Sequence, residues 1–140
     1  MKLIFVCTGN TCRSPLAESI ARAKMPALQV ESRGLFTVDG TPNATHVTQI
    51  VKTFELPEPT TAQQFTEEDL SADVILTMTN QHKAFIISQF GTQQNVYTLH
   101  EYIEQRGEVQ DPFGGSYDNY IHIYHELEGL ISQLQRKISK

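Results

Sequence analysis

The chain has 140 residues, of which 39% are hydrophobic and 19% charged, and its formal net charge is −5. We expect residues 1–140 to form a single domain, because this length and composition suffice for one hydrophobic core. No cluster of basic residues occurs, which argues against a nucleic-acid partner. No apolar run approaches the roughly 20 residues that span a bilayer, and no secretory signal pattern opens the chain, so we expect a cytoplasmic protein without a membrane partner.

Residues 2–6 are apolar, branched and aromatic, which predicts a short buried strand. This strand ends at the turn signal Gly9-Asn10. Ser14-Pro15 then predicts the N-cap and first residue of a helix that ends near residue 25. A strand followed at once by a helix begins a βαβ unit, and its next strand is expected at residues 28–35.

The rest of the chain repeats this alternation. We expect helices at residues 41–56, 79–90, 101–104 and 116–138, a helix start at 66–69, and strands at 73–78 and 95–99. Alternating strands and helices form right-handed crossovers, so the predicted fold is α/β, a three-layer sandwich of a four-stranded parallel sheet with helices on both faces. Ligands of such folds bind beyond the carboxyl ends of the strands, which is where Cys7 is expected.

The octapeptide Cys7–Ser14 joins the first strand to the first helix. A turn of this kind directs backbone N–H groups inward, and the following helix adds its positive dipole end, so the loop suits a dianion. Arg13 can bind two oxygens of that anion through its planar guanidinium, while Cys7 lies beneath the central atom as a nucleophile. The octapeptide therefore predicts phosphoryl transfer through sulfur.

Other loop residues are expected to support the anion and the thiolate. Gly9 lets the backbone approach the anion, and Asn10 can adopt a left-handed conformation or tie the loop through its amide. The simpler alternative for Gly9 and Asn10 is an ordinary turn, in which this pair is also common. The simpler alternative for Cys7 is a small buried hydrophobic residue at the end of a strand. The residues predicted to contact the bound group are Thr8, Gly9, Asn10, Thr11, Cys12, Ser14 and Phe113.

Asp111 is the predicted proton donor on the side of phosphorus opposite the sulfur. It begins the segment Asp111–Gly115, a stiff and then flexible loop that can place a carboxyl group over the Cys7–Ser14 loop. Asp111 would donate a proton in the first step and accept one from water in the second. The simpler alternative is an Asp-Pro pair that only starts a turn.

Cys7 and Cys12 are the only cysteines, which excludes a disulfide framework and a four-cysteine metal site. Oxidised Cys7 could be trapped as a disulfide with Cys12, or Cys12 could simply fill space in the loop. The five histidines lack ligand spacing, and we expect no metal and no cofactor. His82 follows the third predicted strand and could contact the loop or the substrate.

The string Val6–Pro15, together with Asp111-Pro112, resembles the low-molecular-weight protein tyrosine phosphatase family, and the resemblance covers the whole chain. It implies a cofactor-independent phosphatase that acts on phosphorylated proteins. The implied roles are a phosphocysteine at Cys7, an oxyanion clamp at Arg13, loop and thiolate support at Asn10 and Ser14, and acid then base chemistry at Asp111.

Two positions look more like the bacterial protein-arginine phosphatase branch. Thr11 stands where members acting on phosphotyrosine usually have a larger aliphatic residue, and Phe113 is followed by two glycines where they often have a second aromatic. Phosphoarginine ends in a flat, cationic guanidinium, so a hydroxyl at Thr11 can hydrogen-bond where isoleucine would offer only apolar contact. The resemblance therefore predicts a protein-arginine phosphatase, with a phosphotyrosine phosphatase as the alternative.

Two other classes are less consistent with the sequence. Arsenate reductases share such a loop but need further thiols to relay electrons, and no cysteine follows Cys12. A non-catalytic phosphate-binding module would need the loop and Arg13 but would have no use for Cys7 or Asp111. We expect a monomer.

Overall fold

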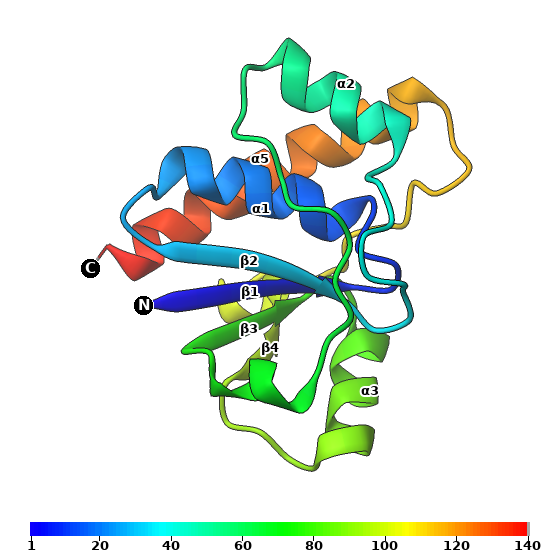
Figure 1. The fold of residues 1–140 in the computed structure, drawn as a ribbon. Coiled ribbons are helices and arrows are strands. Elements are labelled where there is room, and N and C mark those ends of the chain that lie inside the picture. The colour runs from blue at the N-terminus through cyan, green and yellow to red at the C-terminus, as the bar shows by residue number, and fades with distance from the viewer. Residues whose placement is uncertain (140) are drawn as a thin grey trace.

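The computed structural model describes residues 1–139 and contains a four-stranded sheet with the strand order β2-β1-β3-β4 (Figure 1). All three neighbouring pairs are parallel. The strands are β1 (Lys2–Cys7), β2 (Gln29–Gly34), β3 (Val74–Thr77) and β4 (Val96–Thr98). The helices are α1 (Arg13–Lys24), α2 (Thr45–Thr53), α3 (Asn80–Phe90), α4 (Leu99–Tyr102), α5 (Tyr117–Ile138) and the 3-10 helix η1 (Glu67–Ser71).

Helices cover both faces of the sheet, as the alternation of strands and helices predicts. Figure 1 shows α1 and α5 on one face and α3 on the other. The internal strand β1 contributes Leu3 and Phe5 to the core on the α1 and α5 side, and Ile4 and Val6 to the core on the α3 side. This division follows from the alternation of side chains along a strand. Because all four side chains are fully buried, β1 holds the residue at its end firmly.

The residue at that end is Cys7, which pairs with Gly34 of β2. Pairing continues beyond the strands, because the Leu35 N–H donates to the Cys7 carbonyl (3.1 Å) and the Phe36 N–H to the Thr8 carbonyl (2.9 Å). Helix α3 also starts at the carboxyl ends of the strands, while β1 starts at their opposite, amino ends (Figure 1). The fold therefore places the Cys7–Ser14 loop at the carboxyl ends of the strands.

The prediction that Ser14 caps the first helix is wrong. The helix begins at Arg13, and its N-cap is Cys12, which makes no side-chain cap hydrogen bond. The Ser14 hydroxyl instead contacts Cys7 and Asn10, because it lies inside the loop rather than at its rim.

Two other helices begin at different residues from those predicted. Helix α2 starts at residue 45 rather than 41, because the preceding segment is held extended by hydrogen bonds from the Ala44 N–H to the Thr11 carbonyl and from the Ala62 N–H to the Thr41 carbonyl. Helix α4 starts earlier than predicted, since Thr98 caps it. No helix among residues 1–139 has both the length and the apolar character needed to cross a membrane.

Candidate active site

A cavity of about 250 Å³ opens at the carboxyl end of β1. It is lined by Cys7, Thr8, Gly9, Thr11, Cys12, Arg13, Asp111 and Phe113. The structure therefore brings together the three predicted catalytic residues and most of the predicted contact residues. Asn10 and Ser14 do not line the cavity, because their side chains are fully buried behind the loop.

Two groups face the sulfur of Cys7. The Ser14 Oγ lies 2.9 Å from the Cys7 Sγ, and the backbone N–H of Asn10 donates to the same sulfur at 3.3 Å. A hydroxyl and an amide that both point at one sulfur can stabilise a negative charge there. The loop thus surrounds the Cys7 sulfur with two polar groups.

Asn10 holds the loop in both of the ways considered from the sequence. Its backbone is left-handed, with φ of 55°. Its amide nitrogen donates to Ser14 Oγ (2.8 Å) and Ser32 Oγ (2.9 Å), and its amide oxygen accepts from the Gln63 N–H (2.9 Å). One fully buried side chain thus ties the loop to α1, to β2 and to the segment that precedes η1.

The network continues behind Asn10 to residues that sequence reasoning missed. Ser32 donates to a carboxylate oxygen of Glu18 at 2.5 Å, and the other oxygen of Glu18 pairs with Arg22 at 2.8 Å. Glu18 is fully buried in α1, where a carboxylate without partners would be costly. The available signal was the spacing of Glu18 and Arg22, four residues apart on one helix, but Ser32, which links Glu18 to Asn10, lies on β2.

Gly34 lets the loop pack against β2. A Cβ atom at this position would lie 2.9 Å from Asn10 Cβ and 3.0 Å from the Gly9 carbonyl carbon, closer than such atoms can approach. A Cβ at Gly9 would meet only Thr11 Oγ1, at 3.7 Å. Of these two positions, contacts with protein atoms therefore require glycine at residue 34 and not at residue 9. Gly34 is not among the residues predicted from the sequence.

The guanidinium of Arg13 is fixed at the wall of the cavity. Its Nη1 donates to the Val109 carbonyl (3.0 Å), and its Nη2 lies 3.7 Å from a carboxylate oxygen of Asp111. Its Nε is buried and has no hydrogen-bond partner among residues 1–139. Because a buried N–H without a partner is costly, this atom is suited to an acceptor supplied by a ligand.

The Asp111–Gly115 loop stands over the cavity, as expected. Asp111 accepts a hydrogen bond from the Phe113 N–H (3.0 Å), and its side chain is 52% exposed. Phe113 is 78% exposed and lines the same cavity. The structure thus places a carboxylate and an aromatic ring at the mouth, opposite the sulfur at the base.

Cys12 is a free thiol, as is Cys7. Its sulfur lies 3.4 Å from the Tyr120 hydroxyl and 3.7 Å from Thr11 Oγ1. Burial raises the pKa of Cys12 despite these two contacts, so this thiol stays protonated at neutral pH. The pairing of Cys7 with Cys12 under oxidation stays a prediction.

His82 contacts the loop, which was one of the two possibilities considered for it. Its Nε2 lies 2.9 Å from Thr8 Oγ1. Burial and the nearby charge of Arg13 lower the pKa of His82 to about 4, so the imidazole is neutral at pH 7. No group of three or more His, Cys, Asp or Glu side chains among residues 1–139 could hold a metal ion.

Comparison with known proteins identifies the family. Residues 2–140 match the model of the low molecular weight phosphotyrosine protein phosphatase family. The chain is 54% identical over 135 residues to the low molecular weight protein-tyrosine-phosphatase PtpB of Staphylococcus aureus, a match that covers 96% of this chain and 97% of the relative.

Two solved structures of YwlE arginine phosphatase have the same fold. One is a C7S mutant with a phosphorylated active-site serine (39% identity, TM-score 0.96, covering 100% of this chain and 97% of the other). The second, from Geobacillus stearothermophilus, is 33% identical with a TM-score of 0.94, covering 99% of this chain and 92% of the other. This chain is thus a protein phosphatase that belongs to the low molecular weight phosphotyrosine protein phosphatase family.

Proposed function

We propose that this protein removes phosphate from phosphorylated arginine in proteins through a phosphocysteine intermediate. The observation that carries the proposal is the position of Thr11, whose side chain lines the cavity together with Cys7 and Arg13. Two free cysteines, one of which must stay reduced to act as a nucleophile, suit the reducing conditions of the cytoplasm, where we place the enzyme.

In the first step the phosphoryl group binds in the Cys7–Ser14 loop. Backbone N–H groups and the guanidinium of Arg13 bind its oxygens, and the Nε of Arg13 gains the acceptor it lacks. The Cys7 thiolate attacks phosphorus, so a P–S bond forms and the P–N bond to the arginine side chain breaks. Asp111 donates the proton that the leaving guanidine nitrogen needs.

In the second step a water molecule replaces the leaving group. Asp111, now ionised, accepts a proton from this water as its oxygen attacks phosphorus. The P–S bond breaks, inorganic phosphate leaves, and the Cys7 thiolate is regenerated. The YwlE arginine phosphatase structure with a phosphorylated serine at the active site supports the covalent step, because there a side chain at the active site carries the phosphate.

The mouth of the cavity suits a phosphorylated guanidinium. The carboxyl group of Asp111 is half-exposed and can hydrogen-bond to a guanidinium nitrogen. Among residues 1–139, the hydroxyl of Thr11 has one hydrogen-bond contact, the weakly accepting sulfur of Cys12 at 3.7 Å. That hydroxyl is therefore free to exchange hydrogen bonds with a guanidinium. The exposed ring of Phe113 offers a flat apolar wall.

Phosphotyrosine is the second candidate substrate. It is favoured by the name of the Staphylococcus aureus relative, which is a protein-tyrosine-phosphatase and shares 54% identity with this chain. The same nucleophile, clamp and acid would serve a phenolic leaving group. An aromatic substrate would also pack against Phe113.

The two substrates are separated by measuring kcat/KM on one peptide carrying either phosphoarginine or phosphotyrosine. We expect wild type to prefer phosphoarginine, and Thr11→Ile to shift the ratio toward phosphotyrosine by about tenfold, because a polar contact is exchanged for an apolar one. Thr53→Ile, which makes the same exchange at an exposed position on α2, should leave the ratio unchanged. A wild type that prefers phosphotyrosine would overturn the arginine assignment.

A further inference from the structure

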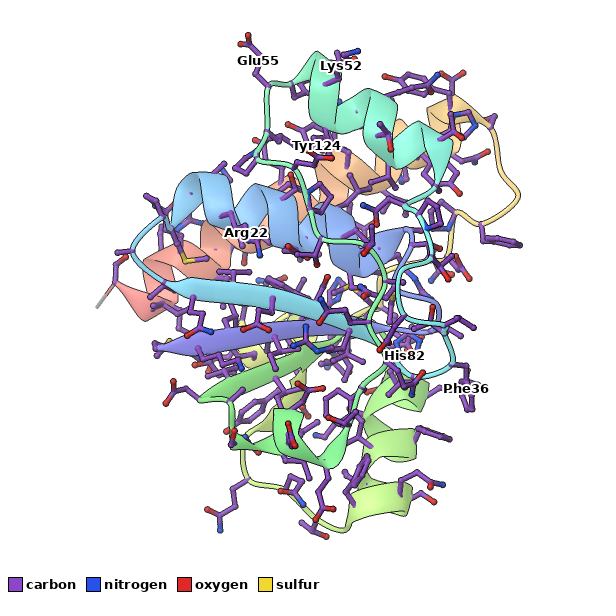
Figure 2. The ribbon with its side chains drawn as sticks, viewed as in Figure 1. Arg22, Phe36, Lys52, Glu55, His82 and Tyr124 are labelled. Carbon is purple, nitrogen blue, oxygen red and sulfur yellow. The ribbon has the colours of Figure 1, made fainter. Side chains whose placement is uncertain are left out.

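His82 joins the Cys7–Ser14 loop to the helix on the opposite face of the sheet from α1. The Asn10 end of the loop is tied by several buried or half-buried groups, whereas the side chain of Thr8 has one partner in the part of the chain that the structure describes, His82 Nε2 at 2.9 Å. Figure 2 shows His82 at the carboxyl edge of the sheet, where α3 begins. We propose that His82 is a positioning residue, which holds the Thr8 hydroxyl so that Thr8 can donate to the phosphoryl group. This inference rests on the proposed phosphatase function.

His82 is itself rigidly held. It is only 7% exposed, and its backbone N–H donates to the capping hydroxyl of Thr79 at 3.2 Å. The charged groups around its ring are Arg13 from α1 and, from the segment after α4, Glu108 and Asp111. The ring is neutral at pH 7, in agreement with the lowered pKa described above. A neutral ring carries a proton on only one of its two nitrogens.

The surroundings decide which nitrogen carries that proton. His82 Nδ1 is buried and has no hydrogen-bond partner among residues 1–139. A proton on Nδ1 would leave a buried donor unpaired, whereas a proton on Nε2 is donated to Thr8 Oγ1. Buried donors without partners are rarer in proteins than acceptors without partners, so the proton belongs on Nε2.

This assignment determines what Thr8 can do. Thr8 Oγ1 accepts from His82, so its own hydroxyl proton is not used by the imidazole. Thr8 is exposed and lines the cavity beside Cys7, where that proton can be donated to a phosphoryl oxygen. The Thr8 carbonyl is held at the same time by the Phe36 N–H at 2.9 Å. Thr8 is thus fixed at its backbone and oriented at its hydroxyl.

The experiment measures kcat and KM of His82 variants on the preferred phosphopeptide. His82→Leu removes the donor, and we expect kcat to fall about five- to tenfold, the loss of one hydrogen bond in the transition state, with little change in KM. His82→Gln places an amide nitrogen near the position of Nε2 and should restore most of kcat. His82→Asn is shorter, does not reach Thr8, and should remain as slow as His82→Leu.

Thr8→Val tests the same contact from its other partner. It should lower kcat at least as much as His82→Leu. The double variant should be no slower than Thr8→Val, because both substitutions remove the same hydrogen bond. If the two losses multiply in the double variant, or if Gln and Asn at position 82 behave alike, the proposal is wrong.

His100 provides a matched control. It is also 7% exposed, and its buried Nδ1 has no hydrogen-bond partner within residues 1–139, but it lies on α4 and does not line the cavity. His100→Leu should change thermal stability as a core substitution does and leave kcat at the wild-type value. If His82→Leu likewise changes only thermal stability, the positioning role is overturned. An inactive wild type would instead contradict the proposed function.

Discussion

The Cys7–Ser14 loop and the Asp111–Gly115 loop face the same cavity, but the first is tied into the core and the second is exposed. Asn10 alone makes three side-chain hydrogen bonds to buried or half-buried partners. The carboxylate of Asp111 has one hydrogen bond, to its own loop, and a 3.7 Å contact with Arg13. The proposed anion site is thus anchored to the core, whereas the proposed acid is held by few contacts.

This difference corresponds to two requirements of the proposed reaction. Stabilising charge at phosphorus needs donors that do not reorganise when the charge develops, and these come from the rigid loop. The acid must work on a leaving group in one step and on water in the next, so it must leave room for both to enter and depart. We therefore expect substitutions in the exposed loop to change chemistry more than stability, and substitutions of the buried anchors of the Cys7–Ser14 loop to change both.

The largest effect is expected for Asp111→Asn. Asparagine keeps the hydrogen bond to the Phe113 N–H but cannot donate or accept the proton, so kcat should fall by about a hundredfold or more. Its midpoint of urea unfolding should match wild type, because the side chain is half-exposed. The loss of kcat/KM, which reports the first step and not the hydrolysis of the phosphocysteine, should be much smaller on an aryl phosphate whose leaving group needs no proton. Equal losses on both substrates would argue against Asp111 as the acid.

A smaller effect, on stability as well as activity, is expected for Asn10→Ala. The change removes the acceptor of the Gln63 N–H and the amide that donates to the Ser32 hydroxyl, and it puts alanine in a left-handed conformation. The free energy of unfolding should fall by about 3 kcal/mol, measured by urea denaturation. Asn10→Gly, which tolerates positive φ, separates the lost hydrogen bonds from the backbone strain.

The matched control for this prediction is Asn80→Ala. Asn80 is exposed at the first residue of α3, where alanine is a good helix former, and this variant should unfold close to the wild-type urea concentration. If Asn10→Ala is as stable as Asn80→Ala, the buried network does not hold the loop.

The two loops also differ in how much of them the sequence predicts. The position of the Cys7–Ser14 loop between a strand and a helix can be predicted from local patterns. An apolar strand, a turn signal and a helix start are neighbours in the chain. The anchors of the loop are not local. Ser32 and Gln63 reach Asn10 only because β2 and the segment before η1 lie beside the loop, which no short-range pattern reveals.

The wrong prediction for Ser14 has a related cause. A serine followed by proline is typical of a helix N-terminus, and the helix does begin at this point. Inside the loop, however, the hydroxyl lies 2.9 Å from the Cys7 sulfur and accepts from Asn10, so contacts within the folded loop override the preference for a cap. Local rules located the site, whereas the partners of its side chains depended on how the loop itself folds and on the segments that pack beside it.

The smallest effect that still distinguishes the two loops is expected for Gly34→Ala. Its new methyl group would press on Asn10 Cβ and the Gly9 carbonyl carbon, so the free energy of unfolding should fall by about 2 kcal/mol and the loop should shift away from β2. Gly129→Ala has open space around it in α5 and should instead stabilise the protein by about 1 kcal/mol. Gly9→Ala meets only Thr11 Oγ1 at 3.7 Å, so it should unfold like wild type but bind inorganic phosphate more weakly if the anion approaches the backbone there. Urea denaturation and phosphate titration of the three variants test whether the steric constraint on the loop comes from β2 or from the ligand. If Gly9→Ala is destabilised and Gly34→Ala is not, the steric requirement for glycine lies at residue 9 rather than at residue 34.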